Sequence, residues 1–253
     1  MLQRGMPPAV DEVHVWQASL AASPFPDPSS VLSPEELGHA NRFGNPARRA
    51  AFLLARATLR GVLAHESGLD AAALRFATGP HGKPFLIDPP TALRFNLSHS
   101  GEIVLCAVAW GRDVGVDVER VKPDIDHAAL ARRFFSPLEN EQLSSLPPAL
   151  QRAAFFATWT RKEAVVKAWG VGLSLPLDRF DVSVDPHRPA QLVGVRDGPR
   201  CGGHWSIHQL RIGCGYAAAV AVQGPLGTLI RRRWGHDGPE PAPQEGAGSG
   251  CAD

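Results

Sequence analysis

Two kinds of hydrophobic pattern alternate along the chain. Two long Ala-rich stretches, 46–66 and 150–169, predict helices. Short runs of mainly apolar residues follow each long helix and predict strands. These runs lie at 74–77, 93–97, 103–110 and 113–119, and again at 179–184, 190–196, 204–210 and 215–222. Because strands follow a long helix twice, we expect an α+β fold.

The sequence repeats itself at a spacing of 103 residues. The pattern S-P-x-E at 33–36 recurs at 136–139, and each copy predicts a helix start. The serine is the N-cap, the proline is in the first turn and the glutamate closes a capping box. The tetrapeptide RAAF at 49–52 recurs at 152–155. Two matches in the same order predict two related halves of about 100 residues.

We expect these halves at 1–112 and 113–224, with Arg60 aligned on Glu163 by the spacing of 103 residues. The last segment, 225–253, is rich in Gly, Pro and Arg, which predicts a mostly disordered tail. No signal peptide is visible at the start, and no apolar run is long enough to cross a bilayer. The four cysteines lack metal-ligand spacing, so we expect them reduced in a cytoplasmic protein.

The segment GVDVE at 115–119 alternates between apolar and acidic residues. On a strand, Asp117 and Glu119 project from one face with Cα atoms about 6.6 Å apart, and the valines project from the other. Two carboxylates this close repel each other unless a cation lies between them. Their oxygen atoms suit Mg²⁺. A strand with a solvated acidic face is the alternative that this pattern leaves open.

The predicted helix at 150–169 carries charges within an apolar sequence. At about 100° per residue, Glu163 falls within the apolar stripe and Lys167 falls at its margin. The opposite sector is expected to face solvent and holds Arg161, Ala164 and Ala168. A carboxylate that faces inward needs a cation as partner. Glu163 is therefore either part of a structural ion pair or a ligand of a metal shared with the acidic strand.

Polar residues that can bind phosphate lie in the first half. The stretch FNLSHS places Ser98 and His99 in a polar turn before the strand at 103–110, and HGKP places Lys83 at a tight turn. Hydroxyl, imidazole and ammonium groups can hold phosphate oxygens. An ordinary capped turn and a plain hairpin are the alternatives. Arginines on the first long helix can also reach a phosphate, although most helical arginines are solvated; they are Arg48, Arg49, Arg56 and Arg60.

The balance of charge argues against two kinds of partner. The chain has 26 Lys and Arg against 25 Asp and Glu, so its net charge is +1. This balance provides no bulk attraction to nucleic acid or to an anionic membrane. Only four of the 26 basic residues are lysines, and Lys162 and Lys167 lie beside Glu163.

As a set, these motifs resemble the 4′-phosphopantetheinyl transferase superfamily, specifically its longer, Sfp-type branch. The resemblance rests on GVDVE at 115–119 and WTRKEAVVK at 159–167. They are similar to that family's G-[IV]-D-[IV]-E and W-x-x-K-E-x-x-x-K. The stretches NLSHS at 96–100, GKP at 82–84 and GLSLPL at 172–177 reinforce the resemblance, and order and spacing agree over about residues 40–185.

The resemblance implies two similar α+β halves related by pseudo-two-fold symmetry, with the active site between them in a monomer. It implies an enzyme that transfers 4′-phosphopantetheine from coenzyme A to a serine of an apo acyl or peptidyl carrier protein. Adenosine 3′,5′-bisphosphate is the product that leaves. The carriers would serve fatty acid, polyketide or nonribosomal peptide synthesis.

The resemblance also implies roles for single residues. Asp117, Glu119 and Glu163 would hold Mg²⁺, with water at the position of Val118, which has no ligand atom. Glu163 would also be the general base on the serine, and Lys167 would stabilise the leaving phosphate. The residues implied to bind coenzyme A are Arg48, Arg49, Arg56, Lys83, Ser98, His99, Lys162 and Lys167. For Lys162 the alternative is a structural role.

Two other classes of function fit parts of the sequence. A Mg²⁺-dependent nuclease would use carboxylates and a lysine, but the sequence lacks the usual E-x-K order and a basic stripe with interleaved aromatics. A coenzyme A-binding or partner-binding protein without turnover would keep the fold, but the intact acidic residues and Lys167 argue against it. Carrier contacts are expected within 120–150, where 132–135 (RRFF) suits an acidic helix or is a routine helix end.

Overall fold

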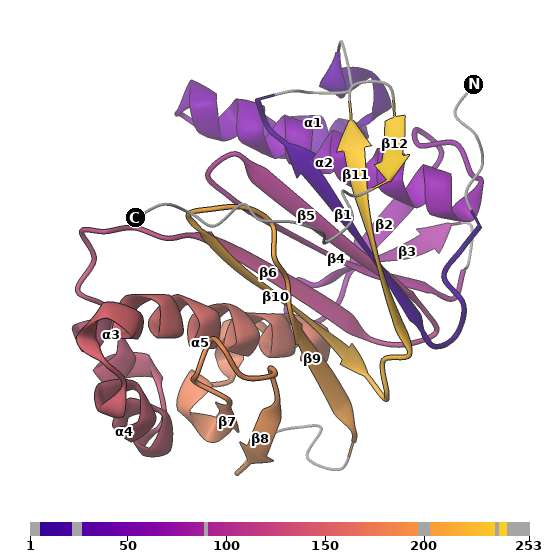
Figure 1. The fold of residues 1–253 in the computed structure, drawn as a ribbon. Helices are drawn as coiled ribbons and strands as arrows, with labels where there is room; N and C mark the ends of the chain where they lie inside the picture. The colour runs from indigo at the N-terminus through magenta and orange to yellow at the C-terminus, as the bar shows by residue number, and fades with distance from the viewer. Residues whose placement is uncertain (1–5, 22–26, 89–90, 197–202, 236–237, 242–253) are drawn as a thin grey trace.

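The computed structural model describes residues 6–21, 27–88, 91–196, 203–235 and 238–241, which form two halves with the same order of elements (Figure 1). The first half comprises β1 Glu12–Ser19, η1 Pro28–Val31, α1 Pro34–Ala40, α2 Pro46–Ser67, β2 Arg75–Thr78, β3 Pro84–Asp88, β4 Leu93–Ser100 and β5 Ile103–Trp110. The second comprises β6 Val114–Arg120, α3 His127–Phe134, α4 Pro137–Ser145, α5 Pro148–Trp169, η2 Gly172–Ser174, η3 Leu177–Arg179, β7 Phe180–Val182, β8 Leu192–Val195, β9 Trp205–Gln209 and β10 Tyr216–Gln223. Two further strands follow, β11 Thr228–Gly235 and β12 Gly238–Pro241.

Each half is built on three antiparallel strands with one long helix packed on their outer face. In the first half β5 pairs with β1 and β4, and in the second half β10 pairs with β6 and β9. Helix α2 packs on the first set and α5 on the second (Figure 1). A small hairpin, β2–β3 or β7–β8, follows each long helix. The predicted α+β fold of two related halves is confirmed.

The two sets of strands pack face to face through a core shared by both halves. Val13, Val15 and Ala107 of the first half lie in one apolar cluster with residues of β6 and β10. The β6 residues in this cluster are Val114, Val116 and Val118. The predicted alternation of GVDVE is therefore confirmed, because its valines lie in the shared core and its acidic face turns toward α5.

Both predicted capping boxes are present. Ser33 accepts the Glu36 backbone N–H while the Glu36 carboxylate accepts the Ser33 N–H, and Ser136 and Glu139 do the same. These reciprocal bonds satisfy backbone donors that the first turn of a helix leaves unpaired. The two glutamates hold matching places in the two halves.

The long helices also match, but at a spacing of 102 residues. Each has 22 residues and begins with a proline, so that Pro46 matches Pro148. Each ends at a left-handed glycine, Gly68 with φ 71° and Gly170 with φ 68°. The RAAF match is one residue out of this structural register. The expected alignment of Arg60 with Glu163 is therefore wrong.

The segment 225–253 contains a strand that its composition does not predict. β11 pairs in parallel with β1, and Trp234 is buried against Trp16 with ring centroids 5.5 Å apart. The predicted disordered tail is thus wrong for Thr228–Gly235, and β12 then pairs with β11. The part of the prediction that concerns 242–253 lies outside the described residues.

The structure also addresses two further expectations, that the cysteines are reduced and that no segment spans a membrane. Cys106 is free and buried, whereas Cys214 is disulfide-bonded, so the expectation of reduced cysteines is wrong for Cys214. Among the described residues, none of the helices combines the length and the hydropathy needed to cross a membrane.

Candidate active site

Glu163 and Lys167 lie on the one solvent-accessible row in the part of α5 that follows residue 153. Between residues 154 and 169 only Trp159, Glu163 and Lys167 are partly exposed, and their spacing of four places them in one line, here called the open row. Neighbouring strands and helices bury the remainder. The expected solvent-facing sector is wrong, because its three members are buried: Arg161, Ala164 and Ala168. Between residues 154 and 169, Glu163 and Lys167 are therefore the two charged side chains that water reaches.

Close packing of β6 on α5 brings the acidic strand to the open row. A Cβ atom on Gly115 would lie 2.2 Å from the Ala164 carbonyl oxygen and 2.3 Å from the Ala168 backbone nitrogen. Only glycine fits at such a distance. Two residues further along the same face, Asp117 is buried beside α5, with 3% of its surface exposed.

Serines of β4 hold both strand carboxylates. The Ser98 Oγ lies 2.9 Å from Asp117 Oδ1, and the Ser100 Oγ lies 2.8 Å from Glu119 Oε2. The Lys167 Nζ lies 2.5 Å from Asp117 Oδ1 and 3.0 Å from Ser98 Oγ. Because β4 belongs to the first half and the other elements belong to the second, the site lies at the junction of the halves.

The electrostatics of the site favour an additional cation. Burial raises the pKa of all three carboxyl groups, those of Asp117, Glu119 and Glu163. The charge of Asp117 raises the pKa values of Glu119 and Glu163 further, while Lys167 lowers all three. One ammonium thus does not balance three carboxylates.

Asp117 has the chemistry of a cation ligand. Its Oδ2 atom is buried and lacks a hydrogen-bond partner among the described residues. A buried acceptor without a partner is costly, and a hard cation would satisfy it. Across the described ranges, however, no three or more His, Cys, Asp and Glu side chains are already arranged to hold a metal ion. The donor atoms fit Mg²⁺, but the three-ligand site remains a prediction.

Lys162 has a structural position and does not reach this site. Its side chain is fully buried, and its Nζ lies 2.8 Å from Glu139 Oε1. The same ammonium donates to the carbonyl oxygens of Leu177 and Phe180. Burial raises the pKa of Glu139 and lowers that of Lys162. The structure therefore favours the structural role of Lys162 over a contact with coenzyme A, because this ammonium is enclosed by protein.

The NLSHS stretch lies on strand β4 and not in the expected turn. The strand extends to Ser100, and the turn follows at Gly101 with φ 57°. Alternation along the strand directs Ser98 and Ser100 toward β6 and exposes His99. Partial burial, and then the charge of Lys167, lower the pKa of His99. Contact of Ser98 and His99 with coenzyme A remains a prediction.

Lys83 connects the two halves. Its Nζ donates to the carbonyl oxygens of Val114 and Ala168, at 3.0 Å each. These bonds hold the start of β6 and the last turn of α5 together, where a cation also complements the helix dipole. A contact between Lys83 and a phosphate remains a prediction.

The arginines predicted to meet the 3′-phosphate differ in their surroundings. Arg48 and Arg49 are exposed in the first turn of α2. Arg56 pairs with Glu36 at 2.5 Å and lies over the ring of Phe76. The exposed pair is thus better placed for an incoming anion than Arg56, which already has a carboxylate partner. Contact of Arg48, Arg49 and Arg56 with the 3′-phosphate remains a prediction.

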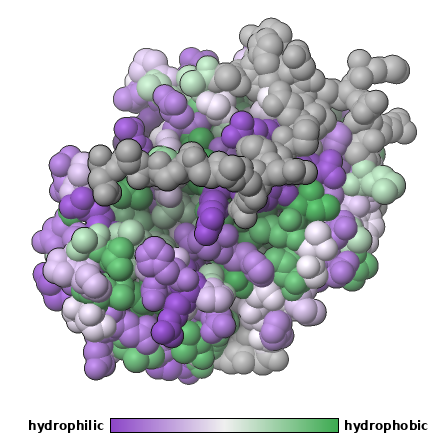
Figure 2. Space-filling view, viewed as in Figure 1, coloured by the Kyte–Doolittle hydropathy of each residue, from purple (hydrophilic) through white to green (hydrophobic). Residues whose placement is uncertain are grey.

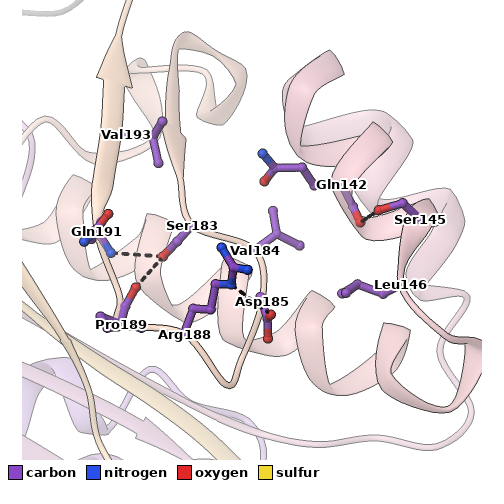
Figure 3. Close-up of a pocket in the computed structure, with 10 residues that line it drawn as sticks. All are labelled: Gln142, Ser145, Leu146, Ser183, Val184, Asp185, Arg188, Pro189, Gln191 and Val193. Carbon is purple, nitrogen blue, oxygen red and sulfur yellow. Dashed lines mark hydrogen bonds and ion pairs between the residues drawn. The ribbon is translucent and has the colours of Figure 1, made fainter.

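Two cavities of similar volume lie in the second half and at the junction. One, of about 490 Å³, lies between β3, β4 and the end of α5, and Lys83 and Trp169 contribute to its walls. The other, of about 510 Å³, lies between α4 and the β7–β8 hairpin (Figure 3). The face in Figure 2 intermingles hydrophilic and hydrophobic side chains. Only the first cavity adjoins a residue predicted to bind coenzyme A.

Sequence reasoning missed three residues that the structure places at or behind the site. Asn96 and Ser100 bond to β6, and Glu139 neutralises Lys162. The period of two in Asn96, Ser98 and Ser100 was a signal, because it matches the period of the acidic strand. The S-P-x-E repeat marked Glu139 as a cap but did not reveal its ion pair.

Comparison with known proteins places the chain in a family. A model described as the 4′-phosphopantetheinyl transferase superfamily matches residues 113–221. The chain is 39% identical over 218 residues to the 4′-phosphopantetheinyl transferase HetI of Nostoc sp., which covers 85% of this chain and 89% of HetI. It is 37% identical over 163 residues to the 4′-phosphopantetheinyl transferase Sfp of Bacillus subtilis, which covers 64% of this chain and 70% of Sfp.

Solved structures give a more distant likeness. The holo-[acyl-carrier-protein] synthase of Helicobacter pylori, solved in complex with coenzyme A, is 23% identical with a TM-score of 0.31. The match covers 44% of this chain and 99% of that one, and a score this low carries no argument about the site. The identity to HetI extends over nearly the whole of both chains. The chain therefore belongs to the 4′-phosphopantetheinyl transferase superfamily.

Proposed function

We propose that this 4′-phosphopantetheinyl transferase carries out its reaction at the junction of its halves, with coenzyme A as donor. The acceptor is a serine of an apo acyl or peptidyl carrier protein of fatty acid, polyketide or nonribosomal peptide synthesis. The observation that supports this site most directly is the unpartnered Oδ2 atom of Asp117 among three carboxyl groups with raised pKa values. Membership of the family supports the reaction class.

Asp117, Glu119 and Glu163 would hold Mg²⁺. Water would complete its shell on the acidic face of β6, because the Val118 side chain lies in the shared core on the other face. Bound there, Mg²⁺ supplies positive charge that neutralises the pyrophosphate oxygens. Asp117 is held by Ser98 and Glu119 by Ser100, whereas Glu163 lies on the open row of α5.

The reaction exchanges one P–O bond for another. The serine Oγ of the carrier bonds to the β-phosphorus of coenzyme A, and the bond from that phosphorus to the bridging oxygen breaks. Adenosine 3′,5′-bisphosphate leaves with the bridging oxygen. Glu163 accepts the serine proton, directly or through water.

Cations and hydroxyls of the chain orient the donor. Lys167 offsets the charge that develops on the leaving phosphate. Lys83 and His99 would contact the other phosphates, and exposed arginines of α2 would meet the 3′-phosphate. Ser98 would border the same site, with its hydroxyl already bonded to Asp117. One chain supplies both sides of the site, which supports a monomer.

A direct test is to incubate the protein with coenzyme A, Mg²⁺ and an apo carrier protein and to determine the mass of the carrier. We expect the carrier to gain one phosphopantetheine group. EDTA should abolish the gain and excess Mg²⁺ should restore it. An unmodified carrier across acyl and peptidyl acceptors would overturn the proposed acceptor class.

A further inference from the structure

Side chains, and not another strand, close one edge of β6. This strand is at the edge of the set β6–β10–β9, so its outer backbone groups have no strand partner within that set. Side-chain oxygens of β4 accept its N–H groups at every second residue. The pairs are Val116 to Asn96 Oδ1 at 2.9 Å, Val118 to Ser98 Oγ at 3.4 Å and Arg120 to Ser100 Oγ at 3.1 Å. We call these three β4 residues the β4 ladder.

The β4 ladder also directs protons toward the carboxylates. A serine hydroxyl has one proton and two acceptor sites. The Ser100 Oγ accepts the Arg120 N–H, which leaves its proton for Glu119 Oε2 at 2.8 Å. The Ser98 Oγ accepts from Val118 and from Lys167.

With both acceptor sites of Ser98 in use, its proton goes to Asp117 Oδ1 at 2.9 Å. Each strand carboxylate is therefore held through one oxygen by a hydroxyl whose orientation the backbone of β6 fixes. At Asp117 the other oxygen, Oδ2, is buried and without a partner among the described residues.

We propose that Asn96 and Ser100 are positioning residues of the transferase site. Asn96 fixes the register between β4 and β6, and Ser100 fixes the Glu119 carboxylate. Together with Ser98 they keep both carboxylates oriented toward the same cation. This inference rests on the proposed function and deepens it, because it assigns the orientation of the metal ligands to the other half of the chain.

The ladder differs from an ordinary strand pairing in what it adds. A neighbouring backbone would satisfy the N–H groups of β6 but would offer no proton to the side chains between them. The hydroxyls of Ser98 and Ser100 do both. Partners that hydrogen-bond to metal ligands change metal affinity by roughly 10–100-fold when removed.

The test measures metal binding to the full-length protein without coenzyme A. Free Mn²⁺ is followed by electron paramagnetic resonance while the protein is titrated. We expect Ser100→Ala to bind Mn²⁺ about 10-fold more weakly than the wild type. Ser100→Thr retains the hydroxyl and should restore most of the affinity. Ser206→Ala is the matched control, because this serine lies on β9, at the other edge of the set β6–β10–β9, and donates to the Gly224 carbonyl oxygen at 2.8 Å.

Asn96 is tested in the same titration. Asn96→Ala leaves the Val116 N–H unpaired and should weaken Mn²⁺ binding. Asn96→Ser keeps a short acceptor of the kind used one step along the ladder, and should bind more tightly than Asn96→Ala. Circular dichroism identifies the variants that fold. If Asn96→Ala does not fold, the Mn²⁺ affinity of Asn96→Ser is compared with that of the wild type, and equal affinities would contradict the positioning role of Asn96.

The outcomes separate this inference from the proposed function. Equal Mn²⁺ affinity of Ser100→Ala and the wild type, with normal carrier modification by the wild type, would overturn the positioning role alone. Weaker binding by Ser100→Ala, with no carrier modified by the wild type, would support the ladder and overturn the function. A wild type that does not bind Mn²⁺ would overturn the inference.

Discussion

The two halves use the same scaffold, but only in the second half does the long helix present a carboxylate, Glu163, to solvent. In each half the capping-box glutamate pairs with a buried cation of the long helix: Glu36 with Arg60, and Glu139 with Lys162. Each cation also donates to carbonyl oxygens beyond the helix. At the spacing of 102 residues, Arg60 aligns with Lys162 and Gly61 aligns with Glu163. The buried ion pair is thus common scaffold, and Glu163 is an addition of the second half.

The acidic strand differs from its counterpart in the same way. His14 of β1 contacts Glu66 in the last turn of α2, as Gly115 of β6 contacts Ala168 in the last turn of α5. Two residues further along each strand stand Trp16 and Asp117.

In the first half the buried acid is satisfied internally. Glu66 accepts from the Trp16 Nε1 at 2.7 Å and lies 2.9 Å from the His14 Nδ1. In the second half the Oδ2 of Asp117 lacks a partner among the described residues. The comparison teaches that a satisfied buried carboxylate is structural, whereas one with an oxygen left over is available for a ligand.

The free edges of the two leading strands are also closed differently. β1 gains a parallel neighbour in β11, while the β4 ladder closes β6. Pairing with a neighbouring strand satisfies the backbone groups of β1 and adds no proton donor for a carboxylate. The ladder leaves hydroxyl protons for the carboxylates, and so only this edge adjoins the site.

Substitution of Asp117 on β6 and of Trp16 at the matching position of β1 should give the largest difference between the halves, in transfer rate and in stability. Asp117→Asn should lower the rate of carrier modification by roughly 10²–10³-fold, because a charged ligand is lost where several kcal/mol of charge stabilisation are needed. Its stability should not fall, since burial already raises the Asp117 pKa and disfavours the ionised form. Trp16→Phe should do the reverse, with lower stability and an unchanged rate. Carrier mass and urea unfolding measure the two effects.

A rate for Asp117→Asn close to that of the wild type would break the comparison. The same would hold if Trp16→Phe slowed transfer as much as Asp117→Asn. Asp70→Asn is a further control, because this side chain only accepts the Ala72 N–H and lies in an exposed turn.

The two capping-box glutamates should differ in their contribution to stability. Glu139→Gln leaves the fully buried Lys162 without its carboxylate and should cost about 3–5 kcal/mol. Glu36→Gln should cost about 1–2 kcal/mol, because Arg60 keeps its bonds to two carbonyl oxygens. The midpoint of urea unfolding measures both. Equal midpoints would show that the two ion pairs are energetically equivalent.

The close approach of β6 to α5 should make Gly115 less tolerant than other glycines. Gly115→Ala places a methyl group against backbone atoms of α5 and should cost about 3 kcal/mol as well as slow transfer. Gly38→Ala is the matched control, because α1 leaves that position open, and it should stabilise the protein by roughly 0.5–1 kcal/mol. A wild-type midpoint for Gly115→Ala would exclude the steric explanation.

The smallest expected effect is a difference in pH dependence. Burial alone would raise the pKa of Glu36, but Arg56, the Ser33 N–H and Arg60 lower it overall. Its stabilising contribution is therefore present above the unfolded pKa of about 4.3 and is lost as the pH falls through the lower folded value. The cost of Glu36→Gln, on the order of 1 kcal/mol, should shrink on acidification.

Urea unfolding of Glu36→Gln and of the wild type from pH 7 to pH 4 measures this change. A cost that stays constant on acidification would contradict the lowered pKa of Glu36.

Local features of the sequence were sufficient to predict the helices and strands and where several of the helices begin or end. Serine caps, first-turn prolines and helix-ending glycines act within a few residues, so the limits of α1, α4 and the end of α5 follow from the chain alone. The alternation in GVDVE likewise fixed which side chains share a face. The repeat showed two halves, but an Ala-rich match at 103 residues concealed the structural spacing of 102.

The helical wheel of α5 gave the wrong exposed sector for a physical reason. It assumes that a helix has one wet face opposite its apolar stripe, whereas strands and helices cover α5 nearly all round. Arg161 is consequently buried, and its guanidinium donates to the Ser183 and Asp185 carbonyl oxygens. Lys162 is buried for the same reason, and its partner Glu139 lies on another helix.

By itself, the sequence determined the α+β class, the two halves, the family and the residues that carry acidic chemistry, because these depend on periods and motifs within short segments. Only the tertiary structure decided which charges meet. The contacts of Ser98 with Asp117, of Lys167 with Asp117 and of Lys83 with Ala168 join residues 19, 50 and 85 positions apart. These contacts depend on how the two halves pack against each other, and a pattern within a short segment of sequence does not determine that packing.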